Sequence, residues 1–167
     1  MKIFHLFLAF CFAVALQPAW GAEDSTSSSI QDGKTGSTPG FTDGGLVSLR
    51  VGNHRIHVEV ASTPESREHG LMQRDALCDD CGMLFVFEKA DKYSFWMMNT
   101  LIPLSIAFIA ADGSIINIDE MSANTTDTHS AQNNALYALE MNKGWFTNNG
   151  VAPADKVQGL KPAQKGN

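Results

Sequence analysis

Two cysteines separated by two residues form the clearest chemistry-bearing pair in this 167-residue chain. Cys78 and Cys81 flank Asp79 and Asp80, and this spacing is typical of thiol–disulfide exchange motifs. However, neighbouring carboxylates disfavour the thiolate that such chemistry needs, and the pair precedes an apolar strand rather than opening a helix. We therefore expect a short structural disulfide that pins the loop before that strand, with thiol-redox activity as the alternative.

The remaining residue types that could do chemistry lack the spacing for it. His54 and His57 lie near the start of a predicted strand, where residues three apart fall on opposite faces and cannot chelate one metal. The chain has no nucleophile-elbow motif and no phosphate-binding glycine loop. The sequence therefore predicts no catalytic set, no metal and no cofactor, and it leans away from an enzyme.

The first elements of the predicted domain are a hairpin and a helix. Leu46–Val51 and residues 55–61 alternate apolar and polar side chains, which predicts two half-buried strands. The intervening Gly52 and Asn53 fit a tight turn. Thr63 is the expected N-cap of a helix that begins with a proline.

Strands dominate the remainder of the domain. The apolar run at residues 83–87 predicts a strand buried on both faces, and the cysteine pair lies just before it. Further strands are expected at residues 93–98, 104–110, 114–118 and 135–141, and a helical turn at 143–148. The fold class is therefore α+β, mostly β: a curved sheet or partly closed barrel with one or two short helices.

The N-terminus has the features of a secretory signal. Lys2 precedes an apolar run at residues 3–16, and Ala19 and Gly21 fit the small-residue positions of a cleavage site. We expect cleavage after Gly21. An uncleaved anchor is the alternative, although the run is shorter than the about 20 residues that span a bilayer.

The predicted organisation has four parts: a signal peptide at residues 1–21, a disordered tether at 22–45, one globular domain at 46–160 and a flexible tail at 161–167. The tether is rich in Ser, Thr, Gly and Asp and has too little apolar surface to fold. Because export leads to an oxidising compartment, it favours a disulfide between the two cysteines that remain.

The net negative charge of the chain excludes some classes of binding partner. Loss of the signal peptide removes Lys2 and leaves 11 basic and 18 acidic residues. A net charge of this sign argues against nucleic acid and anionic lipid surfaces as partners. No second long apolar run follows, so we expect a soluble, periplasmic or secreted protein without a membrane span after cleavage.

Four blocks of the sequence resemble one known family. They are TPESR at 63–67 with GLM at 70–72, GMLFVF at 82–87, FWM and NT within 95–100, and ALE at 138–140 before Gly144 and Trp145. In order and spacing they resemble the bacterial and archaeal family called domain of unknown function 192, from about Leu46 to Val157. The resemblance implies a compact α+β fold and brings no established reaction.

Two positions depart from the family pattern. Ser105 stands where an aspartate usually follows the proline–leucine pair, and Met98 stands where a basic or polar residue is common. If that aspartate belongs to an active site in other members, this chain lacks that function. Met98 removes one candidate ligand contact.

Polar residues within the matched blocks could line a ligand pocket, together with Trp96: they are Arg67, Arg74, Asn99, Thr100 and Glu140. Arginine offers paired donors to a carboxylate or phosphate, and aromatic walls suit a small organic ligand. The structural alternative is an ion pair between Arg67 and Glu140, with side chain-to-backbone bonds closing the turn before Pro103.

Three functions follow from these observations. The first is an exported binding or accessory module for a small molecule or an envelope protein. The second is an envelope-acting hydrolase with a pocket near Arg67, Arg74 and Asn99, which a single pocket gathering these residues with Glu140 would favour. The third is a thiol-redox accessory protein that uses Cys78 and Cys81.

Overall fold

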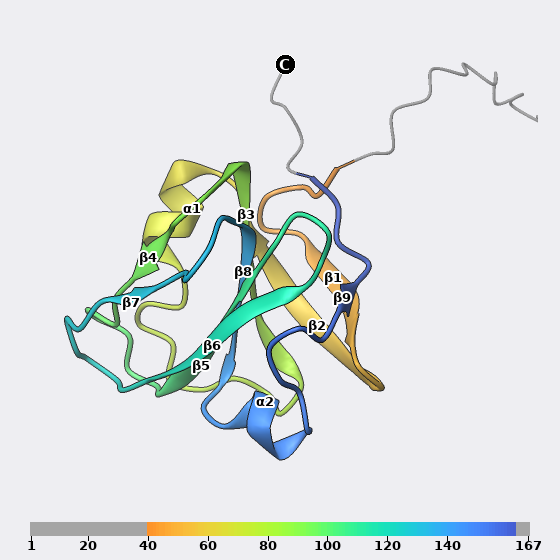
Figure 1. Ribbon diagram of the computed structural model, residues 1–167. Coiled ribbons are helices and arrows are strands. Elements are labelled where there is room, and N and C mark those ends of the chain that lie inside the picture. The colour runs from red at the N-terminus through yellow and green to blue at the C-terminus, as the bar shows by residue number, and fades with distance from the viewer. Residues whose placement is uncertain (1–39, 163–167) are drawn as a thin grey trace, which may run out of the picture. The chain divides into compact units, whose positions relative to one another are not determined.

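The computed structural model describes residues 40–162, which form nine strands and two short helices (Figure 1). The elements are β1 (Leu46–Val51), β2 (His54–Ala61), α1 (Pro64–His69), β3 (Cys81–Asp91), β4 (Ser94–Phe95), β5 (Leu104–Ile109), β6 (Ile115–Met121), β7 (His129–Ser130), β8 (Ala135–Asn142), α2 (Trp145–Asn148) and β9 (Val157–Gln158). This composition confirms the α+β, mostly β fold class. Within these residues, no helix has the length and apolar character needed to cross a membrane.

Seven strands form one curled sheet in the order β6-β5-β8-β3-β2-β1-β9. The sheet makes a half-barrel (Figure 1), which confirms the predicted curvature. Neighbouring strands are antiparallel except β2 and β3, which run parallel because α1 lies in the connection between them. The short strands β4 and β7 pair separately as a second sheet.

The central strands are buried on both faces, as the apolar run at residues 83–87 predicts. Side chains of β3 alternate between two cores: Leu84 and Val86 belong to one, and Met83, Phe85 and Phe87 to the other. Each fully buried side chain of this size contributes roughly 1.5–3 kcal/mol to folding. The sheet is therefore packed on both faces, and one face carries the aromatic residues Phe85 and Phe87.

The helix α1 begins as its sequence predicts. The Thr63 Oγ1 accepts a hydrogen bond from the Ser66 amide at 3.1 Å, and the Thr63 amide donates to the Ser66 Oγ at 3.0 Å. This reciprocal capping satisfies donors that a helix start leaves unpaired. Gly70 ends the helix with a φ of 50°, a conformation that glycine adopts more readily than other residues.

The folded region extends beyond the predicted domain at both ends. Phe41 is buried, and its amide donates to the Pro162 carbonyl at 3.0 Å. Asp43 accepts hydrogen bonds at 2.6 Å from the Ser62 amide and the Ser66 hydroxyl. The described contacts of residues 41, 43 and 162 thus lie outside the range 46–160 that the sequence predicts for the domain. The predicted signal peptide, the predicted tether up to residue 39 and the predicted tail from residue 163 lie outside the described residues.

The strand expected at residues 93–98 is also shorter than predicted. Only Ser94–Phe95 is extended and paired. The chain then turns, because the Thr100 amide bonds back to the Met97 carbonyl at 3.1 Å and Asn99 has a φ of 60°. Its aromatic side chains cover the main sheet rather than forming another strand of it.

Candidate ligand-binding site

A cavity of about 240 Å³ lies between α1, the turn that follows it, the segment around β4 and one face of β3 and β8. We call it the Glu140 pocket. Five aromatic residues line it: Phe85, Phe87, Tyr93, Phe95 and Trp96. Phe85 and Phe95 meet edge to face at 4.9 Å, and Phe87 stacks on Tyr93 at 3.5 Å between ring centroids. These ring contacts hold the walls in place before any ligand arrives.

Glu140 lies at the centre of the main sheet. On β8 it is in register with Met83 of β3 on one side and with Ile106 of β5 on the other. Its side chain is 4% exposed, and among the described residues it is the only buried Asp, Glu, Lys, Arg or His. Glu140 lines the pocket, and its carboxyl group has no hydrogen bond or ion pair with the described residues.

Burial controls the protonation of this carboxyl group. Desolvation raises the pKa of Glu140 to about 8, because the charged form loses its water without gaining a partner. At neutral pH the empty pocket therefore holds a mostly protonated acid. Such a group can donate one hydrogen bond, or it can ionise when a cation arrives.

The predicted ion pair between Arg67 and Glu140 is wrong. The Arg67 Nη1 donates instead to two backbone carbonyls, those of Ser62 at 2.6 Å and Val86 at 3.0 Å. Its guanidinium lies 5.5 Å from the ring centroid of Phe87. Arg67 thus lines the pocket while joining α1 to the sheet, since carbonyls at the end of β2 and within β3 are its nearer partners.

Thr100 and Trp96, two of the candidate residues from the sequence, also line the pocket, and they do so at different depths. Thr100 is buried, and its hydroxyl has no partner among the described residues. Trp96 is 52% exposed and therefore lies at the outer edge. The pocket thus offers two polar side chains without protein partners and one large aromatic surface open to solvent.

Two predicted pocket residues lie outside the lining. Arg74 forms an ion pair with Glu59, with 2.6 Å between Nη2 and Oε2. Asn99 is exposed in the turn after Met97, and its carbonyl accepts from the Gln73 amide at 2.9 Å. The structure therefore brings together Arg67, Trp96, Thr100 and Glu140 but leaves out Arg74 and Asn99.

Sequence reasoning missed other members of the lining. Glu68 and His69 come from α1, and residues 70–72 come from the turn after it. The sequence predicts a doubly buried strand at residues 83–87, and Phe85 and Phe87 on that strand belong to a core and also border the cavity. Alternation along β3 could have placed them with Glu140 on one face, had the pairing of β3 with β8 been known.

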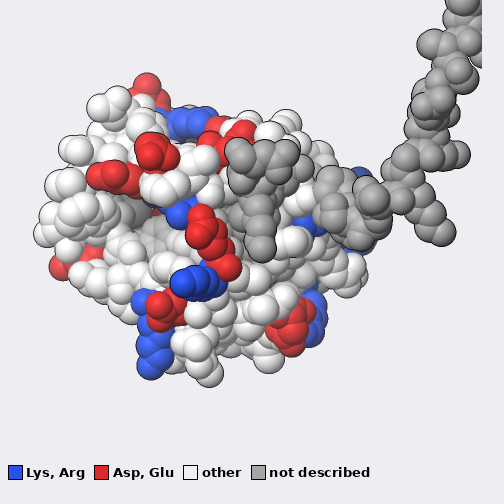
Figure 2. Space-filling view, turned by 90° about the horizontal axis from the view of Figure 1, so that it is seen from above, with Lys and Arg blue, Asp and Glu red and all other residues white. Residues whose placement is uncertain are grey.

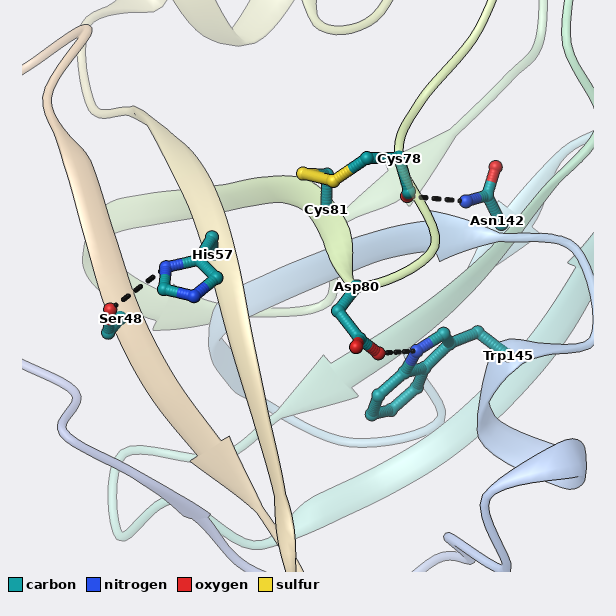
Figure 3. The surroundings of a disulfide bond; sticks show 7 residues. All are labelled: Ser48, His57, Cys78, Asp80, Cys81, Asn142 and Trp145. Atoms are coloured by element: carbon teal, nitrogen blue, oxygen red, sulfur yellow. Dashed lines mark hydrogen bonds between the residues drawn. A yellow bond between two sulfur atoms is a disulfide. The ribbon is translucent and has the colours of Figure 1, made fainter. Parts of the chain in front are cut away.

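The cysteine pair forms the expected disulfide (Figure 3). Cys81 begins β3, and the Cys78 carbonyl accepts from the Asn142 Nδ2 at 2.9 Å. Between them, the Asp80 carboxylate accepts from the Trp145 Nε1 at 3.0 Å. The loop is thus tied to the end of β8 and to α2. Neither cysteine lines the Glu140 pocket, which fits a structural role.

Ser105, where the family resemblance implies an aspartate in other members, faces away from the pocket. It is fully buried, and its Oγ donates to the Glu120 Oε1 at 2.8 Å while accepting from the Gly144 amide at 2.8 Å. The Gly144 amide also reaches the Glu120 Oε2 at 3.1 Å. Met98 is partly exposed and lies outside the lining. Neither departure from the family pattern alters the pocket wall.

Metal binding finds no support in the described residues, which contain no group of three or more His, Cys, Asp or Glu side chains placed to hold an ion. The arrangement can instead do two things. Its apolar walls can bury an organic molecule, and its unpaired carboxyl and hydroxyl groups can bond to polar atoms of that molecule.

Comparisons with known proteins agree with the family resemblance. The model of the DUF192 family, described as an uncharacterized ACR, matches residues 47–159. A Sinorhizobium meliloti protein, provisionally described as a transcription regulator, is 33% identical with a TM-score of 0.67, and the match covers 71% of this chain and 97% of that one. A protein of unknown function from Novosphingobium aromaticivorans is 34% identical with a TM-score of 0.64, over 68% and 84% of the two chains. No curated protein matches. The chain therefore belongs to the DUF192 family.

Proposed function

We propose that this protein is an exported binding module that takes up a small organic molecule in the Glu140 pocket. The observation that carries the proposal is the unpaired carboxyl of Glu140, which is 4% exposed and borders an aromatic-walled cavity. Among the described residues no fully buried side-chain nitrogen or oxygen lacks a hydrogen-bond partner. The carboxyl oxygens of Glu140, which bond to no protein group, therefore open into the pocket, where a ligand can bond to them.

The size of the cavity limits the ligand. Pockets for drug-sized molecules enclose about 300–1,000 Å³, whereas this one encloses about 240 Å³. A ligand smaller than a typical drug, with one polar group near Glu140 and an apolar body against the rings, fits these dimensions. The exposed Trp96 at the edge would cover the bound molecule.

A hydrolase finds less support. Glycoside hydrolysis uses two positioned carboxyl groups, but Glu140 is the one buried acid of the described lining. Arg74 and Asn99, on which the hydrolase hypothesis depends, lie outside the cavity. The thiol-redox hypothesis is weaker still, because the disulfide loop is held by Asn142 and Trp145.

Export is supported by the N-terminal residues and by the disulfide, since disulfides persist in oxidising compartments. The Sinorhizobium relative is provisionally described as a transcription regulator, a role that would involve nucleic acid. The net negative charge of this chain argues against nucleic-acid binding. The chain has 12 basic and 18 acidic residues. On the face seen in Figure 2, the basic residues lie scattered beside acidic ones and form no continuous basic patch.

A thermal-shift screen tests the binding proposal. The full-length gene product would be expressed, purified from the envelope fraction and heated with small metabolites and envelope fragments. A compound at 100 times its Kd stabilises the native state by about 2.7 kcal/mol, which raises Tm by several degrees. We expect Trp96→Ala, by weakening binding about tenfold, to reduce this shift to about half, and Met98→Ala, outside the lining, to keep it in full. A flat response to every compound, or a gene product that stays in the cytosol with Met1 in place, would contradict the proposal.

A further inference from the structure

We propose that the Glu140 pocket selects small organic cations, with an ammonium group against the Glu140 carboxylate and an apolar body against the aromatic walls. This inference rests on the proposed binding function and names its ligand class. Three features of the pocket lead to it: the missing partner of Glu140, the engagement of Arg67 elsewhere, and the aromatic lining.

The protein supplies no cation to Glu140. Arg67 is the one arginine or lysine of the described lining, and its Nη1 bonds to the carbonyls of Ser62 and Val86. In register, Glu140 is flanked by the apolar Met83 and Ile106. The carboxyl group therefore has no donor or cation from the described residues, and a ligand in the pocket can supply one. An ammonium group brings three donors and the charge that a buried carboxylate lacks.

The walls favour the same charge. Ring faces attract cations, by about 0.5–1 kcal/mol at exposed sites and by about 2 kcal/mol or more where water is excluded. Phe85, Phe95 and Trp96 border the cavity that Glu140 reaches. The rings would also bury the methylene or aryl part of the ligand, which adds roughly 25 cal/mol for each Å² removed from water.

An anionic ligand fits these groups less well. It would face Glu68 and, where the pH is above about 8, an ionised Glu140, against the single guanidinium of Arg67. That guanidinium already bonds to two carbonyls and lies over Phe87. A carboxylate ligand would therefore gain less from Arg67 than an ammonium gains from Glu140.

The pH dependence of affinity distinguishes these ligand classes. Burial raises the pKa of Glu140 to about 8, so an ammonium ligand has to displace a proton below that pH and binds more tightly as pH rises. An anion would bind more tightly as pH falls. The other titratable groups of the lining are Arg67, Glu68 and His69 on α1 and Tyr93 before β4, and Glu140→Gln separates their contribution from that of Glu140.

Titration calorimetry with three matched probes provides the test: phenethylamine, 2-phenylethanol and phenylacetate. An alkyl ammonium stays protonated up to about pH 9. With the wild-type protein we expect phenethylamine to bind at least tenfold more tightly than either analogue at pH 9. Its affinity should fall about tenfold at pH 7, where about a tenth of Glu140 is ionised. Glu140→Gln should remove both the preference and the pH dependence.

Several results would overturn the inference. They are equal or tighter binding of 2-phenylethanol or phenylacetate, binding of phenethylamine that Glu140→Gln leaves unchanged, and absence of phenethylamine binding. If phenethylamine fails while the thermal-shift screen finds other ligands whose shift Trp96→Ala reduces, the ligand class is wrong and the binding function stands. If both experiments are blank, both proposals fail. A circular-dichroism melt of Glu140→Gln confirms that the variant is folded.

Discussion

Ser105 and Glu140 lie one register position apart on the paired strands β5 and β8, and their side chains point to opposite faces of the sheet. Glu140 is in register with Ile106, whereas Ser105 is in register with Met141. Glu140 therefore reaches the aromatic-walled pocket, while Ser105 reaches the core beneath α2. Ser105, one of the two positions at which the family resemblance implies a different residue, is thus separated by the sheet from the position that we propose binds a ligand.

The stability of the protein should depend on pH through Glu140. Its pKa is raised from an ordinary 4.5 to about 8, so between these values the native state holds a proton that the unfolded state has released. Native stability therefore falls as pH rises from about 4.5 to about 8, by on the order of 4 kcal/mol. Urea denaturation of wild type and Glu140→Gln at pH 5 and pH 9 measures the effect.

Glu140→Gln should match the wild type at pH 5, where both side chains are neutral, and exceed its stability at pH 9. Other titrating groups affect both proteins alike and cancel in the difference. Equal stabilities at both pH values would show that the carboxyl group is solvated or paired in solution, which contradicts its burial in the structure.

Substitution of an exposed residue at the edge of the pocket tests ligand binding with little effect on stability. Trp96 is 52% exposed and lines the cavity, whereas Met98 is 37% exposed and does not. Exposed positions such as these change stability by about 0.5 kcal/mol or less. We expect Trp96→Ala to weaken the affinity for any pocket ligand about tenfold, since loss of a large aromatic contact exceeds about 1 kcal/mol.

Met98→Ala is the matched control for that experiment and should leave the Kd unchanged. Both values come from the same calorimetric titration, with Tm recorded for each variant. Equal weakening by the two substitutions would place the ligand on the outer surface of residues 96–101 and not inside the cavity.

The disulfide should act on stability and not on binding. Cys78 and Cys81 close a loop of four residues, for which the chain-entropy model gives about 2 kcal/mol. We expect Cys78→Ser with Cys81→Ser to lower the free energy of unfolding by about this amount and to leave ligand affinity unchanged. The oxidised wild type treated with a thiol reductant should lose the same stability.

A thiol–disulfide exchange assay completes this comparison. The wild type is expected to be inactive in reduction of insulin, since Asp79 and Asp80 disfavour a reactive thiolate beside the cysteines. Turnover that the double serine variant abolishes would restore the redox hypothesis.

Local signals predicted the elements of this fold well. Alternation predicted β1 and β2, Thr63 and its proline predicted the start of α1, and an apolar run predicted β3 as a doubly buried strand. These patterns depend only on residues that are close in the sequence, because the order of apolar and polar side chains indicates which of them are buried.

The members of the pocket were harder to predict because they depend on pairing between distant segments. Four of the six proposed residues line the Glu140 pocket. The sequence alone did not show which groups Arg67 and Arg74 would bond to. Arg67 bonds to carbonyls, which every residue has, and Arg74 pairs with Glu59 across a parallel crossover. Glu140 itself left a signal, as a single acid within the apolar strand β8.

The hydrogen bonds at Ser105 lead to a prediction about the family position. Ser105 and Glu120 lie on paired strands, and both accept from the Gly144 amide, at 2.8 and 3.1 Å. The Glu120 carboxylate thus already lies next to residue 105. An aspartate at residue 105 would add a second carboxylate beside it. We expect Ser105→Asp to destabilise the protein by about 1–3 kcal/mol, because it buries a second carboxylate beside the first.

Glu120→Gln should restore most of that loss, since the carboxylate introduced by Ser105→Asp could then accept from the Gly144 amide without a charged neighbour. Urea denaturation of the wild type, both single variants and the double variant gives the coupling energy between the two positions. Additive effects would mean that Ser105 and Glu120 anchor the turn independently. Binding at the Glu140 pocket should stay the same in all four proteins, because the sheet separates it from this cluster.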